Sequence, residues 1–457
     1  MIQPYDLLTA LDLYSLMLFF WFTLLFDLPR YLMSAVTMAC VPWQSPPPKR
    51  CSTSAVVAGH NEAKTIRQCV RSLEVDEIIV VDDGSTDDMW LEVQRLKEEG
   101  IITNAIRLPS RQSKPAAVNI GLALCSGEIV LIIDADTVLA PGAVAVVLGY
   151  FSDPKVGGVN FHLQVRNERA TLTTWFQAIE YSIAVSAGKR MADALGILPN
   201  VSGAAGAFRR TALEQVGGQD IEVAEDAALS MKLRDAGWQL RFAPDAIART
   251  TVPETPVSLL LQRLRWDSSI ITIYWRKHAR NLNPFGRHFS LANMLTNLDV
   301  VWFSAILPLV LPVYLVWLYN SVGEVSITFL VTVFLGLCAL DVILCVVTCV
   351  PLRFWPYVPY YVIVQNLDFE ANYWNGLFLP KGTPEPVVQK LHDAVVATID
   401  NPSVQARLKE VGVTVVAQQR RSREYLQKFV ASEIEKWAVH QDKRRALGLK
   451  PMNIKRE

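Results

Sequence analysis

The chain has 457 residues, 51% of them hydrophobic, and its 44 Lys and Arg residues balance its 44 Asp and Glu residues. This length predicts two or three domains. The balanced charge gives no reason to expect a nucleic-acid partner, and the absence of a CxxC pair among the seven cysteines argues against a disulfide framework or a zinc site.

The first predicted element is an apolar segment, residues 7–28, which is long enough to cross a bilayer. A cleaved signal peptide is the alternative, but it requires a basic region before the apolar run. No Lys or Arg precedes Arg30. We therefore expect an uncleaved transmembrane anchor within residues 1–44.

Two further apolar segments, within residues 296–350, predict membrane spans at 300–319 and 327–350. The proline-rich segment 351–367 is expected to lie in the membrane interface or to form a short membrane segment. Basic residues follow the first span and precede the second, so the positive-inside rule places the region between them in the cytoplasm. We therefore expect an integral protein of a bacterial-type inner membrane, in contact with membrane lipid.

The region between these spans, residues 50–255, alternates between strand and helix signals. Strands are predicted at 53–59, 76–85 and 129–133, and helices at 62–73, 86–100 and 113–127. This alternation predicts an α/β domain with a mostly parallel sheet and helices on both faces.

Two of the predicted strands end in pairs of acids, Asp82 with Asp83 and Asp134 with Asp136. Ligands bind beyond the carboxyl ends of the strands in such sheets, so we expect these acids to meet at one edge. Their oxygens suit Mg²⁺ or Mn²⁺ holding a nucleotide diphosphate. The alternative for each pair is an ordinary turn or helix cap, where Asp is common.

Two later helices also carry candidate residues. Residues 201–213 predict a loop of small residues followed by a helix start, and residues 224–238 predict a helix with Glu225 and Asp226 in its first turn. These acids suit either stabilisation of the helix dipole or a general base. Residues 256–290 are expected to hold an amphipathic helix at the membrane interface, which includes the sequence QRLRW.

Residues from about 53 to 280 resemble the family-2 glycosyltransferases, and within them the membrane-bound processive-type branch of cellulose, hyaluronan and poly-N-acetylglucosamine synthases. Four motifs carry the resemblance in the family's order: VVDDGSTDD, DAD, AED and QRLRW. Each motif is weak alone, but the ordered set is specific. The resemblance implies a GT-A-like α/β fold with transmembrane helices and a small α/β C-terminal appendage.

The resemblance also implies a role for each matching residue. The implied nucleotide-sugar ligands are Asp82, Asp83, Lys114 and Asp134, the metal ligand is Asp136, the catalytic acids are Asp226 as base and Glu225 beside it, and the groups for the acceptor end and the diphosphate are Gln262, Arg265 and Trp266. The metal would be Mg²⁺ or Mn²⁺. One base without a nucleophilic intermediate implies a single displacement with inversion, and hence a β-linkage. Ser113 and Ala224 stand where the family commonly has Gly and Thr, which leaves donor and acceptor preference open.

The implied activity is transfer from a UDP-sugar, with UDP-GlcNAc and UDP-glucose as the leading donors, to a growing polysaccharide. The alternative within the enzyme class is single transfer to a lipid-linked or short glycan acceptor. The alternative outside it is a binding or transport accessory that acts through the C-terminal tail.

That tail, residues 368–457, resembles the C-terminal part of the solute-binding proteins of tripartite tricarboxylate transporters, the Bug family. GLFLPKGTPEPVVQKL and DNPSVQARLKEVG carry the resemblance. The larger part of that family's fold has no counterpart in the chain. We therefore expect a fused remnant or small appendage rather than a working carboxylate receptor.

Overall fold

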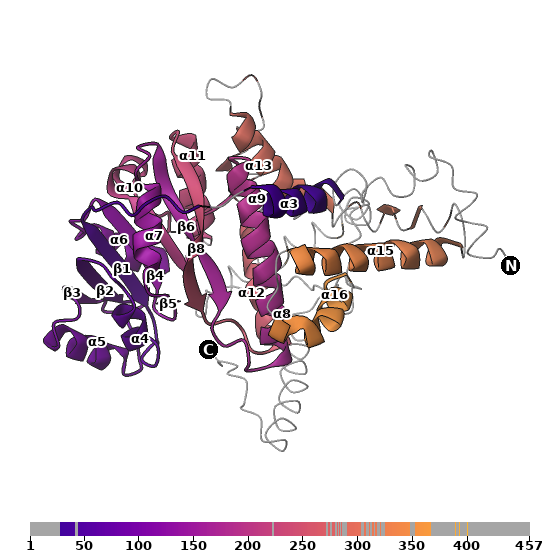
Figure 1. The fold of residues 1–457 in the computed structure, drawn as a ribbon. Coiled ribbons are helices and arrows are strands. Elements are labelled where there is room, and N and C mark those ends of the chain that lie inside the picture. The colour runs from indigo at the N-terminus through magenta and orange to yellow at the C-terminus, as the bar shows by residue number, and fades with distance from the viewer. Residues whose placement is uncertain are drawn as a thin grey trace, which may run out of the picture. The chain divides into compact units, whose positions relative to one another are not determined.

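A computed structural model describes residues 28–41, 44–221, 224–270, 290–302, 325–347 and 352–366, with isolated residues between 273 and 320 and at 389, 393 and 400. The chain divides into two compact units, Met1–Phe369 and Glu370–Glu457. In the first unit, helices surround a large β-sheet (Figure 1).

The sheet has eight strands in the order β3-β2-β1-β4-β7-β6-β8-β5. The strands are β1 (Thr53–Gly59), β2 (Glu77–Asp82), β3 (Asn104–Arg107), β4 (Ile129–Asp134), β5 (Val138–Leu139), β6 (Val156–Val165), β7 (Ala205–Arg209) and β8 (Gln239–Thr250). The predicted parallel order holds for β1 to β4 and for β6 with β8. β7 runs antiparallel to β4 and β6, and β5 runs antiparallel to β8, so the sheet is mixed rather than mostly parallel.

The antiparallel β7 follows from where its chain enters the sheet. The backbone N–H of Asp134, at the end of β4, donates to the carbonyl of Ala204 at 3.0 Å, and β7 begins with the next residue. β7 therefore starts at the edge where β4 ends. The prediction of a loop at 201–213 is accordingly wrong for its centre, which is a strand, and correct in expecting a helix to follow.

Helices cover both faces of this sheet. The helices that lie between the strands in the chain, or follow the last long strand, are α4 (Ile66–Arg71), α5 (Met89–Glu98), α6 (Lys114–Leu122), α7 (Ala143–Tyr150), α8 (Leu172–Glu180), the π-helix η2 (Tyr181–Gly188), α9 (Lys189–Ala194), α10 (Arg210–Val216), α11 (Glu225–Asp235) and α12 (Pro256–Ile270). The remaining helices of the first unit that the structure delimits are α3 (Leu28–Cys40), α13 (Leu291–Val301), α15 (Val325–Val347), the 3-10 helix η6 (Leu352–Tyr357) and α16 (Val358–Asn366).

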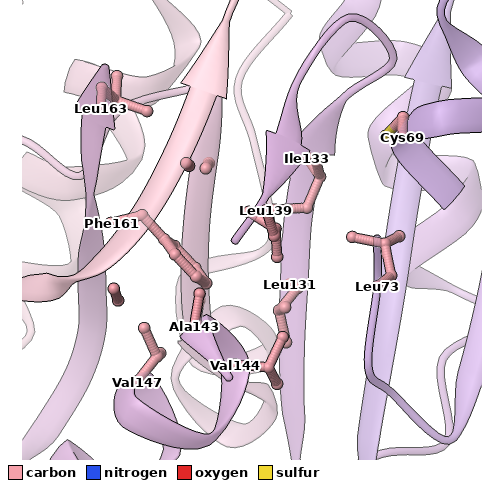
Figure 2. Packing of buried hydrophobic residues seen from close by; sticks show 14 of the residues in the cluster. Cys69, Leu73, Leu131, Ile133, Leu139, Ala143, Val144, Val147, Phe161 and Leu163 are labelled. Carbon is pink, nitrogen blue, oxygen red and sulfur yellow. The ribbon is translucent and has the colours of Figure 1, made fainter. Parts of the chain in front are cut away.

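The central strands are buried on both sides, because successive side chains of a strand point to opposite faces. In β1, Ala55 and Val57 belong to one core and Val56 to the other. α4, α5 and α7 contribute to the first core, and α6, α10 and α11 to the second. Figure 2 shows part of the first core, where side chains of β4 lie beside Leu139 and Val144. The prediction of helices on both faces is confirmed.

The predicted membrane spans are not confirmed. The first, 7–28, lies almost wholly outside the described residues, as does much of 300–319. α15 covers most of the third, 327–350. Among the helices that the structure describes, none combines the length and the apolar character needed to cross a membrane. Apart from three residues, the tail also lies outside the described part of the chain.

Candidate active site

The two acids at the end of β2 hold two different loops, the turn after β2 and the loop that leads into α6. Asp82 is fully buried, and its Oδ1 accepts a hydrogen bond from the Ser85 N–H at 2.8 Å. Asp83 accepts one hydrogen bond on each carboxylate oxygen, from the N–H of Gln112 at 2.6 Å and of Ser113 at 3.0 Å. Asp82 thus holds the turn after β2 and Asp83 the loop before α6, while contacts of both acids with the nucleotide sugar stay predictions.

Lys114 joins two of the predicted acids. Its Nζ lies 2.5 Å from Asp134 Oδ1 and 3.4 Å from Glu225 Oε1, and it donates to the carbonyl of Gly203 at 3.0 Å. Asp134 ends β4 and Glu225 begins α11, so the lysine ties the sheet edge to this helix. Burial disfavours its charged form, but the carboxylates of Asp134 and Glu225 outweigh that effect and raise the pKa of Lys114.

Asp226 lies beside this ion-pair cluster with a fixed orientation. Its Oδ1 accepts a hydrogen bond from the N–H of Ala227 at 2.8 Å, and its Oδ2 accepts one from the N–H of Gly203 at 3.0 Å. A Cβ on Gly203 would lie 3.1 Å from Lys114 Nζ and 3.5 Å from Asp226 Cβ, so this loop packs closely because it has glycine there. The carboxylate is therefore held at the start of α11, next to the partners of Lys114.

Asp136 is the acid best placed to hold a metal. Its Oδ1 accepts only long hydrogen bonds among the described contacts, from the hydroxyls of Thr137 at 3.4 Å and Thr250 at 3.5 Å. Burial raises the pKa of Asp136, and the charge of Glu62 raises it further. A bound cation would relieve this crowding of negative charge.

The residues present fit Mg²⁺ or Mn²⁺. No group of three metal-binding side chains occurs among the residues described. These ions, however, commonly take one or two carboxylates and fill their other positions with phosphate and water. Asp134 and Asp136 supply that number of carboxylates at the strand end.

The QRLRW residues lie on α12. Gln262 has its side-chain oxygen buried with no hydrogen-bond partner among the described atoms, and Trp266 is 36% exposed. The side chain of Arg265 lies outside the described part of the chain, so its predicted contact with the diphosphate is not tested. The exposed indole of Trp266 is therefore a surface that a ligand can reach, whereas the Gln262 oxygen is enclosed.

Two further charged residues at this edge were missed by the sequence analysis. β1 lies between β2 and β4, so Glu62, three residues beyond its end, could have been found by the same strand-end argument. Lys189, by contrast, follows η2 and donates to the carbonyl of Asn200 at 3.4 Å. Burial lowers the pKa of Lys189 to about 8, against the opposing charge of Asp226. No sequence pattern would have placed it there.

Comparison with family models gives two matches. The model for glycosyltransferase-like family 2 matches residues 48–269. The model for the tripartite tricarboxylate transporter family receptor matches residues 343–444. Both resemblances expected from the sequence are therefore confirmed for these segments, while membrane association is not addressed by either match.

Similar proteins include two staphylococcal polysaccharide synthases. The chain is 31% identical over 218 residues to the poly-beta-1,6-N-acetyl-D-glucosamine synthase of Staphylococcus aureus strain COL. The aligned segment covers 46% of this chain and 52% of that relative. It is 32% identical over 220 residues to the enzyme of the same name from Staphylococcus epidermidis, and this alignment covers 47% of this chain and 53% of the relative. This chain thus spans about half the length of these relatives.

A similar solved structure is a mannosyltransferase from Pyrobaculum calidifontis in complex with GDP-Man and Mn²⁺. It matches with a TM-score of 0.53 over 77% of this chain and 99% of that chain, at 21% identity. At this identity the similarity shows a shared fold, which agrees with the expected α/β architecture.

Proposed function

We propose that this protein transfers a sugar from a UDP-sugar to a growing polysaccharide with inversion, because residues 48–269 match the model for glycosyltransferase-like family 2. The observation that carries the proposal is the cluster in which Lys114 joins Asp134 of the sheet edge to Glu225 of α11, with Asp226 beside it. The staphylococcal relatives favour UDP-GlcNAc as the donor and a β-1,6-linked polymer as the product.

In the proposed reaction Asp226 takes the proton from the acceptor hydroxyl as that oxygen attacks the anomeric carbon. The bond between this carbon and the diphosphate oxygen breaks, and UDP leaves with the electron pair. Lys114 and Arg265 provide positive charge toward the departing diphosphate. Trp266 offers an apolar face to a sugar ring of the acceptor.

Asp136, with Asp134, would hold Mg²⁺ or Mn²⁺ in this scheme. The bound ion would supply positive charge that neutralises the diphosphate. Two observations support this: the described hydrogen bonds to Asp136 Oδ1 are long, and the negative charge of Glu62 acts on the same carboxylate.

The test is the Asp226→Asn variant, assayed for UDP release and polymer formation. Loss of the base should lower kcat by about two orders of magnitude or more, with donor affinity little changed. Glu225→Gln is the matched control, because it removes the neighbouring carboxylate but leaves the base, and its kcat should fall less. Both Asp226 oxygens accept N–H donors, so the unfolding temperature must be measured alongside.

A normal kcat in Asp226→Asn, with a large loss in Glu225→Gln, would assign the base to Glu225. Equal losses of donor affinity and kcat would make Asp226 a structural or metal-site residue. If the products carry one added sugar, rather than forming a series of increasing chain length, the result would favour the alternative of single transfer to a lipid carrier or short acceptor.

We also propose that the enzyme acts at the bacterial inner membrane with its catalytic domain in the cytoplasm. The support is the sequence alone, in its apolar segments and the basic residues beside them. Labelling of a cysteine introduced at Glu214, an exposed position on α10, in intact cells tests this: labelling from outside contradicts it.

A further inference from the structure

Arg263 lies within the QRLRW sequence but has no role in the proposed reaction. Its Nη2 is 2.6 Å from Glu180 Oε2, and its guanidinium carbon lies 4.7 Å from the centre of the Trp266 ring. The side chains of both Arg263 and Glu180 are more than two-thirds buried. One arginine therefore connects α8 to the indole expected to contact the acceptor.

The other partner, Glu180, is the last residue of α8, directly before the π-helix η2. Burial raises the pKa of Glu180, while the charge of Arg263 and its hydrogen bond oppose that shift. π-helices are rare and occur frequently at functional sites. An ion pair is therefore placed where the helix changes its winding.

The same helical segment reaches the candidate base at its other end. Lys189 follows η2 and donates to the carbonyl of Asn200, whose side-chain amide lies 3.4 Å from Asp226 Oδ2. Figure 1 shows α8 and α9 as one continuous stretch with α12 alongside. The segment 180–189 thus contacts the surroundings of both Trp266 and Asp226.

We propose that Glu180 and Arg263 form a positioning pair, which orients Trp266 for the sugar ring of the acceptor. The ion pair fixes the guanidinium, and the fixed guanidinium restrains the indole through its ring face. Trp266 keeps a 36% exposed surface for the acceptor. The inference rests on the proposed function for the identity of the acceptor, and assigns to this pair acceptor binding rather than donor binding or chemistry.

The experiment measures binding of a β-1,6-linked GlcNAc oligosaccharide to the full-length protein by calorimetry, together with kcat and the KM for UDP-GlcNAc. Arg263→Gln removes both contacts, and Glu180→Gln removes the ion pair. Each should weaken oligosaccharide binding by about tenfold, with the KM for the donor unchanged. The double variant should be no worse than Arg263→Gln, since the two residues act as one unit.

Arg353 offers a matched control, because it forms the same pair of contacts elsewhere in the fold. Its Nε lies 3.0 Å from Glu168 Oε1, and its guanidinium carbon lies 4.8 Å from the Phe354 ring centre. Arg353→Gln should alter the unfolding temperature but not oligosaccharide binding. Arg263→Lys, which keeps the charge, should recover part of the lost affinity.

A fall in unfolding temperature without loss of oligosaccharide affinity in Arg263→Gln would overturn the inference and leave a structural ion pair. Failure of the unaltered protein to bind the oligosaccharide would also overturn it. Binding without transfer from any UDP-sugar would instead contradict the proposed function alone.

Discussion

Ser113 carries backbone strain at the entrance to α6. Its φ of +110° and ψ of 153° fall in a region that is essentially restricted to glycine, at a cost of about 1–3 kcal/mol. Its hydroxyl is buried without a partner among the described atoms. Its backbone N–H donates to Asp83, a contact that any residue except proline can make.

We predict that Ser113→Gly stabilises the protein. The variant relieves the backbone strain, but glycine also gives the unfolded chain more conformational entropy. The net result should be an increase of about 1 kcal/mol in the free energy of unfolding. Denaturant unfolding measures it. Ser113→Ala removes the unpaired hydroxyl but keeps the Cβ, so it should gain less. A destabilised Gly variant would show that Ser113 is not strained.

Asp136 supports the second prediction at this scale. If it holds the metal, Asp136→Asn should abolish Mg²⁺- or Mn²⁺-dependent turnover and also the rise in unfolding temperature on adding Mn²⁺ with UDP, because binding to the folded state stabilises it. Glu214→Gln, at an exposed position on α10, is the control and should keep both responses. Normal metal titration of the Asp136 variant would contradict the assignment.

Some residues of the candidate site could be predicted from the sequence and others could not. Acids at the ends of β2 and β4 could be predicted, because apolar runs mark the strands and the parallel order brings their ends together. Glu62 was missed, although the same rule applies to it, because it follows the end of β1. Lys189 and Glu180 could not be predicted, since their approach to the site depends on η2 and on packing between distant segments.

At the scale of elements, the strands that were predicted are those rich in β-branched residues. The unpredicted ones are weaker in sequence: β7 is AGAFR, and β8 contains Pro244 and several polar residues. Such strands form because their neighbours pair with them, and tertiary context commonly overrides propensity in this way. The antiparallel pairs of the sheet all involve β7 or β8, so the sequence predicted only β1, β2 and β4 of the eight strands and missed the mixed order.

The packing of α6 on β1 gives a prediction at this scale. A Cβ on Gly121 would lie 2.4 Å from Val56 Cγ1, within the second core, whereas a Cβ on Gly188 would meet nothing within 4 Å. Gly121→Ala should therefore destabilise the protein by about 1–3 kcal/mol, since overpacking outweighs the better helix propensity of alanine. Gly188→Ala lacks the clash and should be neutral or stabilising. Thermal unfolding of both variants checks this, and equal effects would contradict the close approach.

At the scale of the whole molecule, the two family matches do not coincide with the two compact units. The transporter-receptor match begins at residue 343, but the first unit extends to Phe369. Within that overlap, Tyr357 stacks on Trp175 of α8 at 4.6 Å between ring centres, and Phe354 meets the same ring edge-on at 5.2 Å. Residues 352–366 are therefore structurally part of the transferase unit.

This division predicts different outcomes for two truncations. A chain ending at Phe369 keeps the described candidate site residues and the contacts of η6 and α16, so it should retain kcat and its unfolding temperature. A chain ending at residue 351 loses the aromatic contacts to Trp175 and the ion pair of Arg353 with Glu168, and should unfold at a lower temperature. UDP release and thermal unfolding measure both. Loss of turnover in the longer truncation, with its fold intact, would show that residues 370–457 take part in sugar transfer and would revive the alternative in which the tail binds a ligand.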